Sequence, residues 1–191
     1  MQDIMHVKNK VIQASLELAS TKFWGDISLN QIIKKADVNE GDFHALFDDK
    51  DAILAAYDAQ IDRQLADNLE GQFSDSETER DQLFDVLMER FDILNENRAA
   101  VISILNSVTL DPKQAVLSLP HLCKSMNRTL LVADIDLKGL KGALKVTALT
   151  GLYLKVLRDW VKDDSPDMAA TMAALDKSLK TADEWVGRIP I

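Results

Sequence analysis

The side chains best suited to chemistry gather in one stretch, residues 36–54, which reads ADVNEGDFHALFDDKDAIL. If this stretch is helical, Glu40 and His44 lie one turn apart, a spacing at which two side chains can share a metal ion. A closed metal site needs further ligands, and the other histidines, His6 and His121, are unaccompanied in the sequence. We therefore predict a solvated helix face here, with no metal and no cofactor.

The spacing of this stretch is also that of a DNA-binding helix-turn-helix motif. A helix beginning at Ser28 is followed by a tight turn at residues 36–38, and the next helix begins at Asn39, whose short polar side chain suits an N-cap. The acidic residues of the stretch outweigh its one lysine, Lys50, and include Glu40, Asp42, Asp48, Asp49 and Asp51. Because DNA is a polyanion, either the segment binds DNA despite this charge or the fold serves another purpose.

The whole chain is acidic as well, with a net charge of -9 and a pI near 4.8 over 191 residues. This charge opposes non-specific attraction to phosphate backbones and anionic lipid surfaces, so any binding of nucleic acid must be local. The single cysteine, Cys123, lies in an apolar run, and we interpret it as a small buried side chain. No signal sequence or apolar run of membrane-spanning length is present, and we expect a cytoplasmic protein.

The motifs of common catalytic sites are missing from the sequence. There is no HExxH pair, glycine-rich phosphate loop, nucleophile elbow or CxxC pair. We therefore predict that the protein is not an enzyme.

Helices must position these side chains, because the hydrophobic periodicity is helical throughout. Residues 11–23, VIQASLELASTKF, repeat apolar side chains at helical spacing, and no segment alternates with the period of a strand. Helix starts are marked by two capping boxes, Ser28 with Gln31 and Ser76 with Glu79, and by a capping serine with a first-turn proline and acid, 165–167. We predict an all-α protein with helices near residues 5–23, 28–35, 39–46, 50–72, 77–95, 98–108, 113–132, 138–162 and 166–186.

The first 55 residues resemble the N-terminal domain of TetR-family transcriptional regulators. The family pattern runs T/S-x-x-x-I-A-x-x-A-G-V-S-x-G-x-L-Y-x-H-F-x-x-K-E-x-L after a first helix that ends near a glycine. The matching residues here are mainly structural: Phe23, Trp24, Gly25, Ser28, Ile32, Ala36, Val38, Gly41, Phe43, Phe47, Lys50 and Leu54. The resemblance implies a TetR-like fold, with a helix-turn-helix domain over residues 1–49 and a helical ligand-binding and dimerisation domain over residues 50–191.

The departures from the family pattern fall where DNA contact is expected. Asp37 replaces the glycine of the turn, Asn39 the serine cap, and His44 and Ala45 the tyrosine and histidine near the end of the helix. The resemblance makes Lys50 a phosphate-contacting lysine, and neighbouring cations can neutralise the DNA backbone beside the motif. An acidic side chain can also accept a hydrogen bond from cytosine. The predicted DNA-binding residues are Lys34, Lys35, Asn39, Asp42, His44 and Lys50.

Broad apolar stripes follow in the middle of the chain. In TetR-like proteins the middle helices enclose a ligand cavity, so the resemblance implies a small apolar or lipid-like ligand. The alternative is ordinary core packing, because Met and Phe at helical spacing also fill cores. The predicted ligand-binding residues are Phe84, Met88, Phe91, Leu122 and Met126.

We expect residues 138–186 to form a homodimer. The first of two long helices carries small residues that permit close approach of a partner helix, and the second carries an apolar row. TetR relatives dimerise through these two helices as a four-helix bundle, which the resemblance implies here. The predicted dimer residues are Ala143, Thr147, Gly151, Leu175 and Leu179.

A second resemblance concerns residues 80–180. The segment LRDWVKDDSPDMAATMAALDKSL is similar to the end of the lipid-binding accessory proteins of ubiquinone biosynthesis, which share the TetR fold but do not act through DNA. Two hypotheses therefore stay open. The first is a ligand-responsive TetR-type regulator, acting as a repressor on operator DNA, and the second is a lipid-binding protein that has lost DNA binding.

Overall fold

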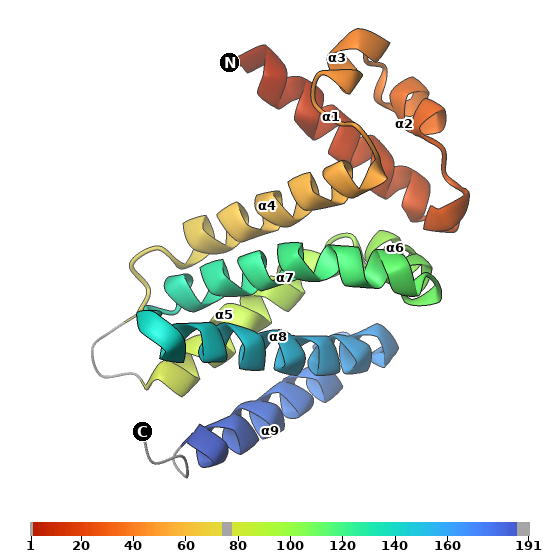
Figure 1. Ribbon diagram of the computed structural model, residues 1–191. Helices are drawn as coiled ribbons and strands as arrows, with labels where there is room; N and C mark the ends of the chain where they lie inside the picture. The colour runs from red at the N-terminus through yellow and green to blue at the C-terminus, as the bar shows by residue number, and fades with distance from the viewer. Residues whose placement is uncertain (1, 74–77, 187–191) are drawn as a thin grey trace. The chain divides into compact units, whose positions relative to one another are not determined.

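The computed structural model describes residues 2–73 and 78–186, and every regular element in these ranges is a helix (Figure 1). The all-α prediction is confirmed. None of the described helices is long and apolar enough to cross a membrane. The elements in chain order are α1 (Gln2–Ala19), the short 3-10 helix η1 (Trp24–Asp26), α2 (Leu29–Ala36), α3 (Glu40–His44), α4 (Lys50–Leu69), α5 (Glu79–Asn95), α6 (Arg98–Leu110), α7 (Pro112–Val132), α8 (Gly139–Lys162) and α9 (Ala169–Val186).

The helices divide into two compact units. The first contains the chain up to Ile61 together with Ile93–His121, and the second contains Asp62–Asp92 together with the chain from Leu122 onward. Three long helices, α4, α5 and α7, each pass from one unit into the other. The compact units therefore have other bounds than the expected domains, 1–49 and 50–191, which stay a prediction.

In the first unit, α1 packs against α2 and α6. The apolar stripe predicted along α1 is buried at Val11, and Phe43 of α3 is buried in the same unit. The connection from α1 to α2 is held by α6: the backbone N–H of Trp24 donates to Ser103 Oγ at 2.9 Å, and Ser103 Oγ donates to the carbonyl of Lys22 at 2.8 Å. One serine hydroxyl thus fixes the chain that leads into the helix-turn-helix segment.

Local polar residues set the helix ends in this unit. The predicted capping box is present at α2: Ser28 Oγ accepts from the N–H of Gln31 at 3.3 Å, and the Gln31 side chain accepts from the N–H of Ser28 at 2.8 Å. In contrast, α1 ends at Ala19 rather than at residue 23. The hydroxyls of Ser20 and Thr21 bond back to carbonyls of the last turn, which competes with further helical pairing.

The start of α5 is capped by a different residue from the one expected. Ser76, the first member of the predicted box with Glu79, lies outside the described residues. The described cap is Thr78, whose Oγ1 accepts from the N–H of Asp81 at 3.2 Å and donates to the Asp81 carboxylate at 2.8 Å. Accordingly α5 begins at Glu79, two residues later than predicted.

The connection between α8 and α9, in the second unit, is built around the buried carboxylate of Asp163. Ser165 donates to this carboxylate from its N–H at 3.1 Å and from its hydroxyl, and Thr171 donates from its N–H and its hydroxyl, both at 2.7 Å. These bonds, those of Ser165 foremost, hold the pKa of Asp163 well below its usual range, although burial acts in the opposite direction. The corner therefore depends on an ionised aspartate.

The start of α9 corrects one detail of the prediction. Ser165 is not the residue directly before the helix, but its Oγ still accepts from the first helical N–H, that of Ala169, at 2.9 Å. Pro166 and Asp167, however, form a turn before the helix rather than its first turn. Met168 follows with a φ of 52°, which is outside helical geometry, so α9 begins only at Ala169.

The core of the second unit is aromatic. The ring of Phe91, from α5, lies 5.5 Å from the ring of Tyr153 and 6.2 Å from the ring of Trp160, both from α8 and both stacked on it. All three side chains are buried. Helices α8 and α9 pack along each other in this unit (Figure 1). Tyr153 also reaches the polar cluster described below.

Candidate functional site

The α2–α3 segment has the local structure that a helix-turn-helix requires. Asp37 ends α2 in the left-handed region, with a φ of 51°, where the family pattern has glycine. Aspartate tolerates this conformation better than most side chains do. Asn39 caps α3, because its Oδ1 accepts from the N–H of Gly41 at 2.7 Å. The turn therefore forms without the family's glycine and serine.

Helix α3 is short, and its solvent-exposed side is acidic. Phe43 is its buried anchor, whereas Glu40, Asp42 and His44 are exposed to solvent. The helix spans five residues, Glu40–His44. Within the described residues, no group of three or more His, Cys, Asp and Glu side chains is placed to hold a metal ion.

Two lysines flank α3 in the last turn of α2. Lys34 is exposed and has no described partner. Lys35 forms an ion pair with Glu17 of α1, with 2.9 Å between Lys35 Nζ and Glu17 Oε2. Both partners of this pair are about half exposed, so it contributes little to stability and can be exchanged for another anion.

Lys50, at the start of α4, points into the protein. Its Nζ donates to the carbonyl of Trp24 at 2.7 Å and to that of Ile27 at 2.9 Å, and it lies 4.9 Å from the centre of the Trp24 ring. Burial lowers the pKa of this ammonium, while Asp51 and Asp26 act in the opposite direction. Lys50 therefore ties η1 to α4, and its protons are used on backbone carbonyls.

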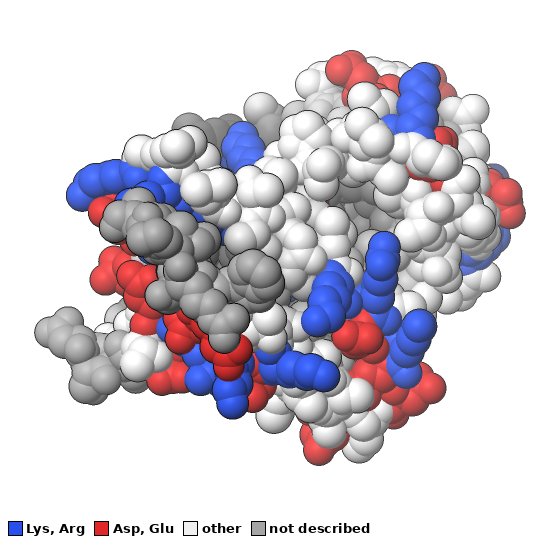
Figure 2. All heavy atoms as spheres, turned by 60° about the horizontal axis from the view of Figure 1, so that its bottom comes forward, with Lys and Arg blue, Asp and Glu red and all other residues white. Residues whose placement is uncertain are grey.

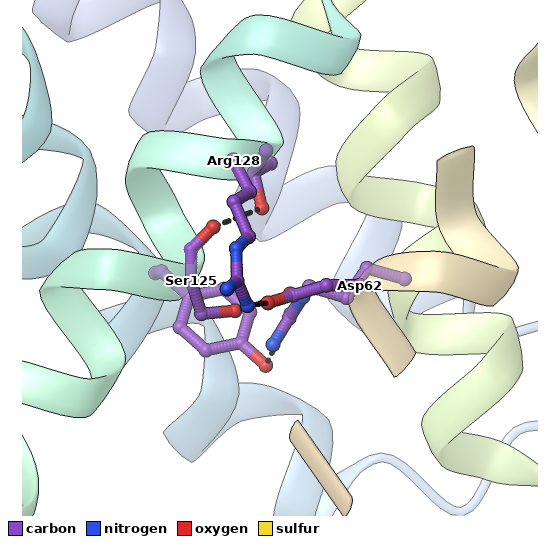
Figure 3. Close-up of polar contacts among 6 residues, drawn as sticks. Asp62, Ser125 and Arg128 are labelled. Carbon is purple, nitrogen blue, oxygen red and sulfur yellow. Dashed lines mark hydrogen bonds and ion pairs between the residues drawn. The ribbon is translucent and has the colours of Figure 1, made fainter. Parts of the chain in front are cut away.

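A cluster of charged side chains lies in the second unit (Figure 3). The carboxylate of Asp62, from α4, accepts from Arg90 Nη1 of α5 at 2.8 Å and from Arg128 Nη1 of α7 at 2.8 Å. The hydroxyl of Ser125 donates to the same carboxylate, and Arg90 Nε donates to the Tyr153 hydroxyl at 3.4 Å. Asp62 and Arg90 are buried, whereas the Arg128 side chain is 42% exposed.

The charges of this cluster compensate one another. Burial alone would raise the pKa of the Asp62 carboxyl, but the hydrogen bonds from Ser125 and Arg128 and the charge of Arg90 outweigh it. The pKa therefore lies below its usual range. Because three helices supply these side chains, the ionised carboxylate joins them at one point.

Comparison with solved structures identifies this architecture. A TetR transcriptional regulator from Nitrosomonas europaea is 17% identical over 93% of this chain and 98% of its own, with a TM-score of 0.73. A TetR-family regulator from Syntrophomonas wolfei is 15% identical over 97% of each chain, with a TM-score of 0.64. A TetR regulator from Rhodococcus sp. RHA1 is 15% identical over 99% of each chain, with a TM-score of 0.59. The chain has the TetR fold.

No protein-family model matches the chain, and no curated protein matches its sequence. At these low identities the three structures establish the TetR fold alone.

Within this TetR fold, the predicted DNA-binding residues differ in what their side chains already contact. Lys34, Asp42 and His44 are exposed and can reach a partner. Asn39 and Lys50 have structural partners instead: the first caps α3 and the second binds the carbonyls of η1. Asn39 and Lys50 were predicted to contact DNA because the resemblance to TetR regulators aligns them with DNA-contacting positions of that family.

The five predicted ligand-binding residues do not line a common pocket in the described part of the chain. Phe91 and Met126 are fully buried, and Phe91 is part of the aromatic core. Phe84 lines a shallow, open groove of the second unit together with Met172 of α9. Met88 and Leu122 are half-buried, and neither borders that groove. The core-packing alternative describes Phe91 and Met126 well.

The predicted dimer residues fall into two groups. Ala143, Thr147 and Gly151 are exposed on one face of α8. On the side of the molecule drawn in Figure 2, uncharged surface lies between groups of charged side chains of both signs. Leu175 and Leu179 of α9, by contrast, are buried against their own chain. These two leucines therefore belong to the core of the single chain.

Sequence reasoning missed Asp62, Arg90 and Ser125. The available signal was a charge inside an apolar stripe: Arg90 stands beside Phe91 and one turn from Leu87 and Leu94, positions that must face the core. A buried arginine at such a position requires a carboxylate, but the sequence does not show which of its many acids supplies it.

Asp62→Asn should destabilise the protein by about 3–5 kcal/mol at neutral pH, because Arg90 stays buried without this carboxylate. Since the folded pKa of Asp62 is depressed, its contribution is present above the unfolded pKa of about 3.9 and is lost as pH falls below that value. The free energy of unfolding of both proteins can be measured by urea unfolding, followed by circular dichroism. The difference between wild type and variant should therefore be smaller at about pH 3 than at about pH 7. Asp67→Asn, an exposed change on the same helix, should cost less than about 0.5 kcal/mol. Equal losses in both variants would contradict this role of Asp62.

Lys50→Met should lower stability by about 1.5–3 kcal/mol, because it removes the charged hydrogen bonds to the carbonyls of Trp24 and Ile27 while keeping the apolar stem. Lys34→Met, which removes an exposed lysine without a described partner, is the matched control and should leave stability within about 0.5 kcal/mol. The midpoint of thermal unfolding measures both. If the two variants unfold at the same temperature, Lys50 is not a structural lysine.

Proposed function

We propose that the protein is a TetR-type transcriptional regulator, acting as a repressor, that binds operator DNA as a homodimer and responds to a small apolar ligand. The observation that carries this proposal is the α2–α3 segment. Its turn is closed at Asp37, its second helix is capped by Asn39, and Phe43 anchors that helix while Asp42 and His44 face solvent. The three similar structures are regulators of this fold, which supports the same reading.

Contact with the DNA backbone must come from cations beside α3, because α3 itself is acidic. Lys34 is the best placed, since it is exposed in the last turn of α2 and has no described partner. Lys35 can join it by exchanging its ion pair with Glu17 for a phosphate. Base contact would fall to Asp42, which can accept from the amino group of cytosine, and to His44.

Ligand response follows from linkage between two sites. A ligand that binds one spacing of the two recognition helices better than another shifts the affinity for the operator by that difference. Phe84, Met88 and Leu122 are the proposed residues whose partial exposure allows them to meet a ligand. Phe91 and Met126 would support them from the core.

The proposed dimer interface is the exposed face of α8. Ala143, Thr147 and Gly151 bring little side-chain bulk to this face, so a partner helix can approach closely. Leu140 and Leu144 are exposed on the same face and supply apolar area for burial. Leu175 and Leu179 would hold α9 in place behind it.

A second candidate function is a lipid-binding protein of the TetR fold that does not act through DNA. It is favoured by the acidic surface of α3 together with the inward position of Lys50, which leaves the helix-turn-helix short of phosphate contacts. This candidate keeps the ligand and the dimer and omits the operator.

Binding to DNA decides between the two candidates. The purified protein should form a complex with its own upstream region, and fluorescence anisotropy should show weaker binding to a scrambled fragment and weaker binding as salt rises from about 50 to about 200 mM. Lys34→Glu should weaken binding to both fragments and reduce the salt slope by about one phosphate per monomer. Lys177→Glu, an exposed change on α9, is the control and should bind like the wild type.

The opposite outcome is equally clear. If the wild type binds neither fragment at low salt while the double change Glu40→Lys and Asp42→Thr creates weak binding, the scaffold retains its shape but the lipid-binding candidate is the correct one.

Gly151→Glu should abolish dimerisation without unfolding the protomer. A Cβ added at Gly151 would have open space around it outside its own helix backbone, but a carboxylate at this position would be buried without a partner in the proposed interface. Sedimentation velocity at micromolar concentration should show a dimer for the wild type and a monomer for the variant, with unchanged helix content. Ala66→Glu, on an exposed position of α4, should remain dimeric. A monomeric wild type would refute the proposed dimer.

A further inference from the structure

The cluster around Asp62 contains more positive than negative charge. Its charged members are the carboxylate of Asp62 and the guanidinium groups of Arg90 and Arg128, so two cations share one anion. Arg90 is 1% exposed and requires a carboxylate, which Asp62 supplies at 2.8 Å. The buried pair is neutral with these two side chains, and the charge of Arg128 is in excess.

Arg128 has N–H donors left for a further acceptor. Its side chain is 42% exposed, and among the described residues only Asp62 accepts from it, through Nη1. A guanidinium carries five N–H donors in a planar fork that matches the oxygens of a carboxylate or phosphate. Arg128 can therefore bind a second anion while Nη1 stays bonded to Asp62.

The guanidinium of Arg128 is held in position by Asp62 (Figure 3). The carboxylate is itself held by Arg90 Nη1 and by the hydroxyl of Ser125, and the side chains of Asp62, Arg90 and Ser125 are all buried. An arginine on an open surface loses rotamer freedom when it binds an anion, whereas much of this loss has already occurred here. Asp62 is thus a positioning residue, and Arg128 is the residue that would contact the ligand.

Two neighbours on α7 extend this site along the exposed side of the helix. Lys124 lies one turn before Arg128, is exposed and has no partner among the described residues. Leu131 follows three residues after Arg128 and is 57% exposed. The other side of this part of α7 is packed, since Met126 and Leu130 are buried, and its rotation about the helix axis is therefore fixed.

The acids around this site do not cancel the excess charge. Helix α7 contains no Asp or Glu, and Asp134, the next acid after Arg128 in the chain, lies beyond its end. On α4, Arg63 and Asp67 are both exposed and have opposite charges. Asp58, one turn before Asp62, already has an interaction in the folded chain and is not a free acid.

We infer that Arg128 and Lys124 bind the phosphate or carboxylate group of an amphipathic small molecule, with Leu131 against its apolar part. The two cations lie four residues apart on one side of α7, so one anionic group can reach both. Contact with the ligand also removes the exposed Leu131 side chain from water. The site goes beyond the proposed function, in which the ligand has no anionic group.

Isothermal titration calorimetry of the full chain tests this site, with octyl phosphate as the probe. Octyl phosphate should bind more tightly than octanol, which lacks the anion, and more tightly than inorganic phosphate, which lacks the apolar part. Arg128→Gln should weaken the binding of octyl phosphate about ten- to hundredfold, because it removes hydrogen bonds between charged groups. Arg128→Lys should bind with intermediate affinity, since it keeps the charge but loses the planar fork.

Arg158→Gln, an exposed change on α8 in the same unit, is the matched control and should bind octyl phosphate like the wild type. Thermal unfolding checks that each variant is folded during the titration, because Arg128 also bonds to Asp62. Lys124→Gln, at an exposed residue without a described partner, should also weaken binding and should leave stability unchanged.

The assignment of Arg128 is wrong if Arg128→Gln binds octyl phosphate like the wild type, or if octanol binds as tightly as octyl phosphate. It is also wrong if the wild type binds neither octyl phosphate nor inorganic phosphate, or if Arg128→Gln loses affinity for DNA but not for octyl phosphate. These titrations contain no operator, so their failure is distinct from a failure of the wild type to bind DNA.

Discussion

The hydrogen bonds to the buried carboxylate of Asp62 are the interaction on which the helix arrangement of the second unit depends. This carboxylate lies on α4, accepts from Arg90 of α5, and accepts from Ser125 and Arg128 of α7, so one ionised group connects three helices. Apolar packing alone leaves helices free to rotate about their axes by small amounts, whereas directed hydrogen bonds to one carboxylate do not. Replacing such a cluster by apolar side chains of equal volume can be neutral for stability, so its specific effect is geometric.

The cluster and the apolar core of the second unit use the same side of α7. The side of this helix that supplies Ser125 to the carboxylate of Asp62 is also the side that buries Met126 and Leu130. In the first unit, Lys50 has a similar effect, because its bonds to the carbonyls of Trp24 and Ile27 hold η1 and thereby the start of α2. In both units a charged side chain is used to position helices, and a side chain used in this way is no longer available to a ligand.

The fold could be predicted from the sequence because its signals are local. Ser28 and Gln31 mark the start of α2 by a reciprocal bond between neighbours, and the apolar period of α1 identifies its buried side. The candidate site was predicted less well. Asn39 caps α3 through a neighbouring N–H, as its sequence context indicates. Lys50 occupies a position that suggests DNA contact, but its partners are the carbonyls of Trp24 and Ile27, which are distant in the sequence. The pairing of Asp62 with Arg90 is separated by 28 positions in the chain, and no local pattern reports it.

The segment whose sequence suggested lipid-binding proteins illustrates why a local resemblance does not determine function. Asp163, Ser165 and Thr171, which carry that resemblance, form the buried corner between α8 and α9. These residues therefore serve the pairing of two helices, and such a structural role is compatible with binding DNA or lipid. Function must therefore be read from side chains that the fold does not use. On this chain they include Lys34 at the end of α2 and Asp42 and His44 on α3, because the packing would tolerate many other residues at these positions.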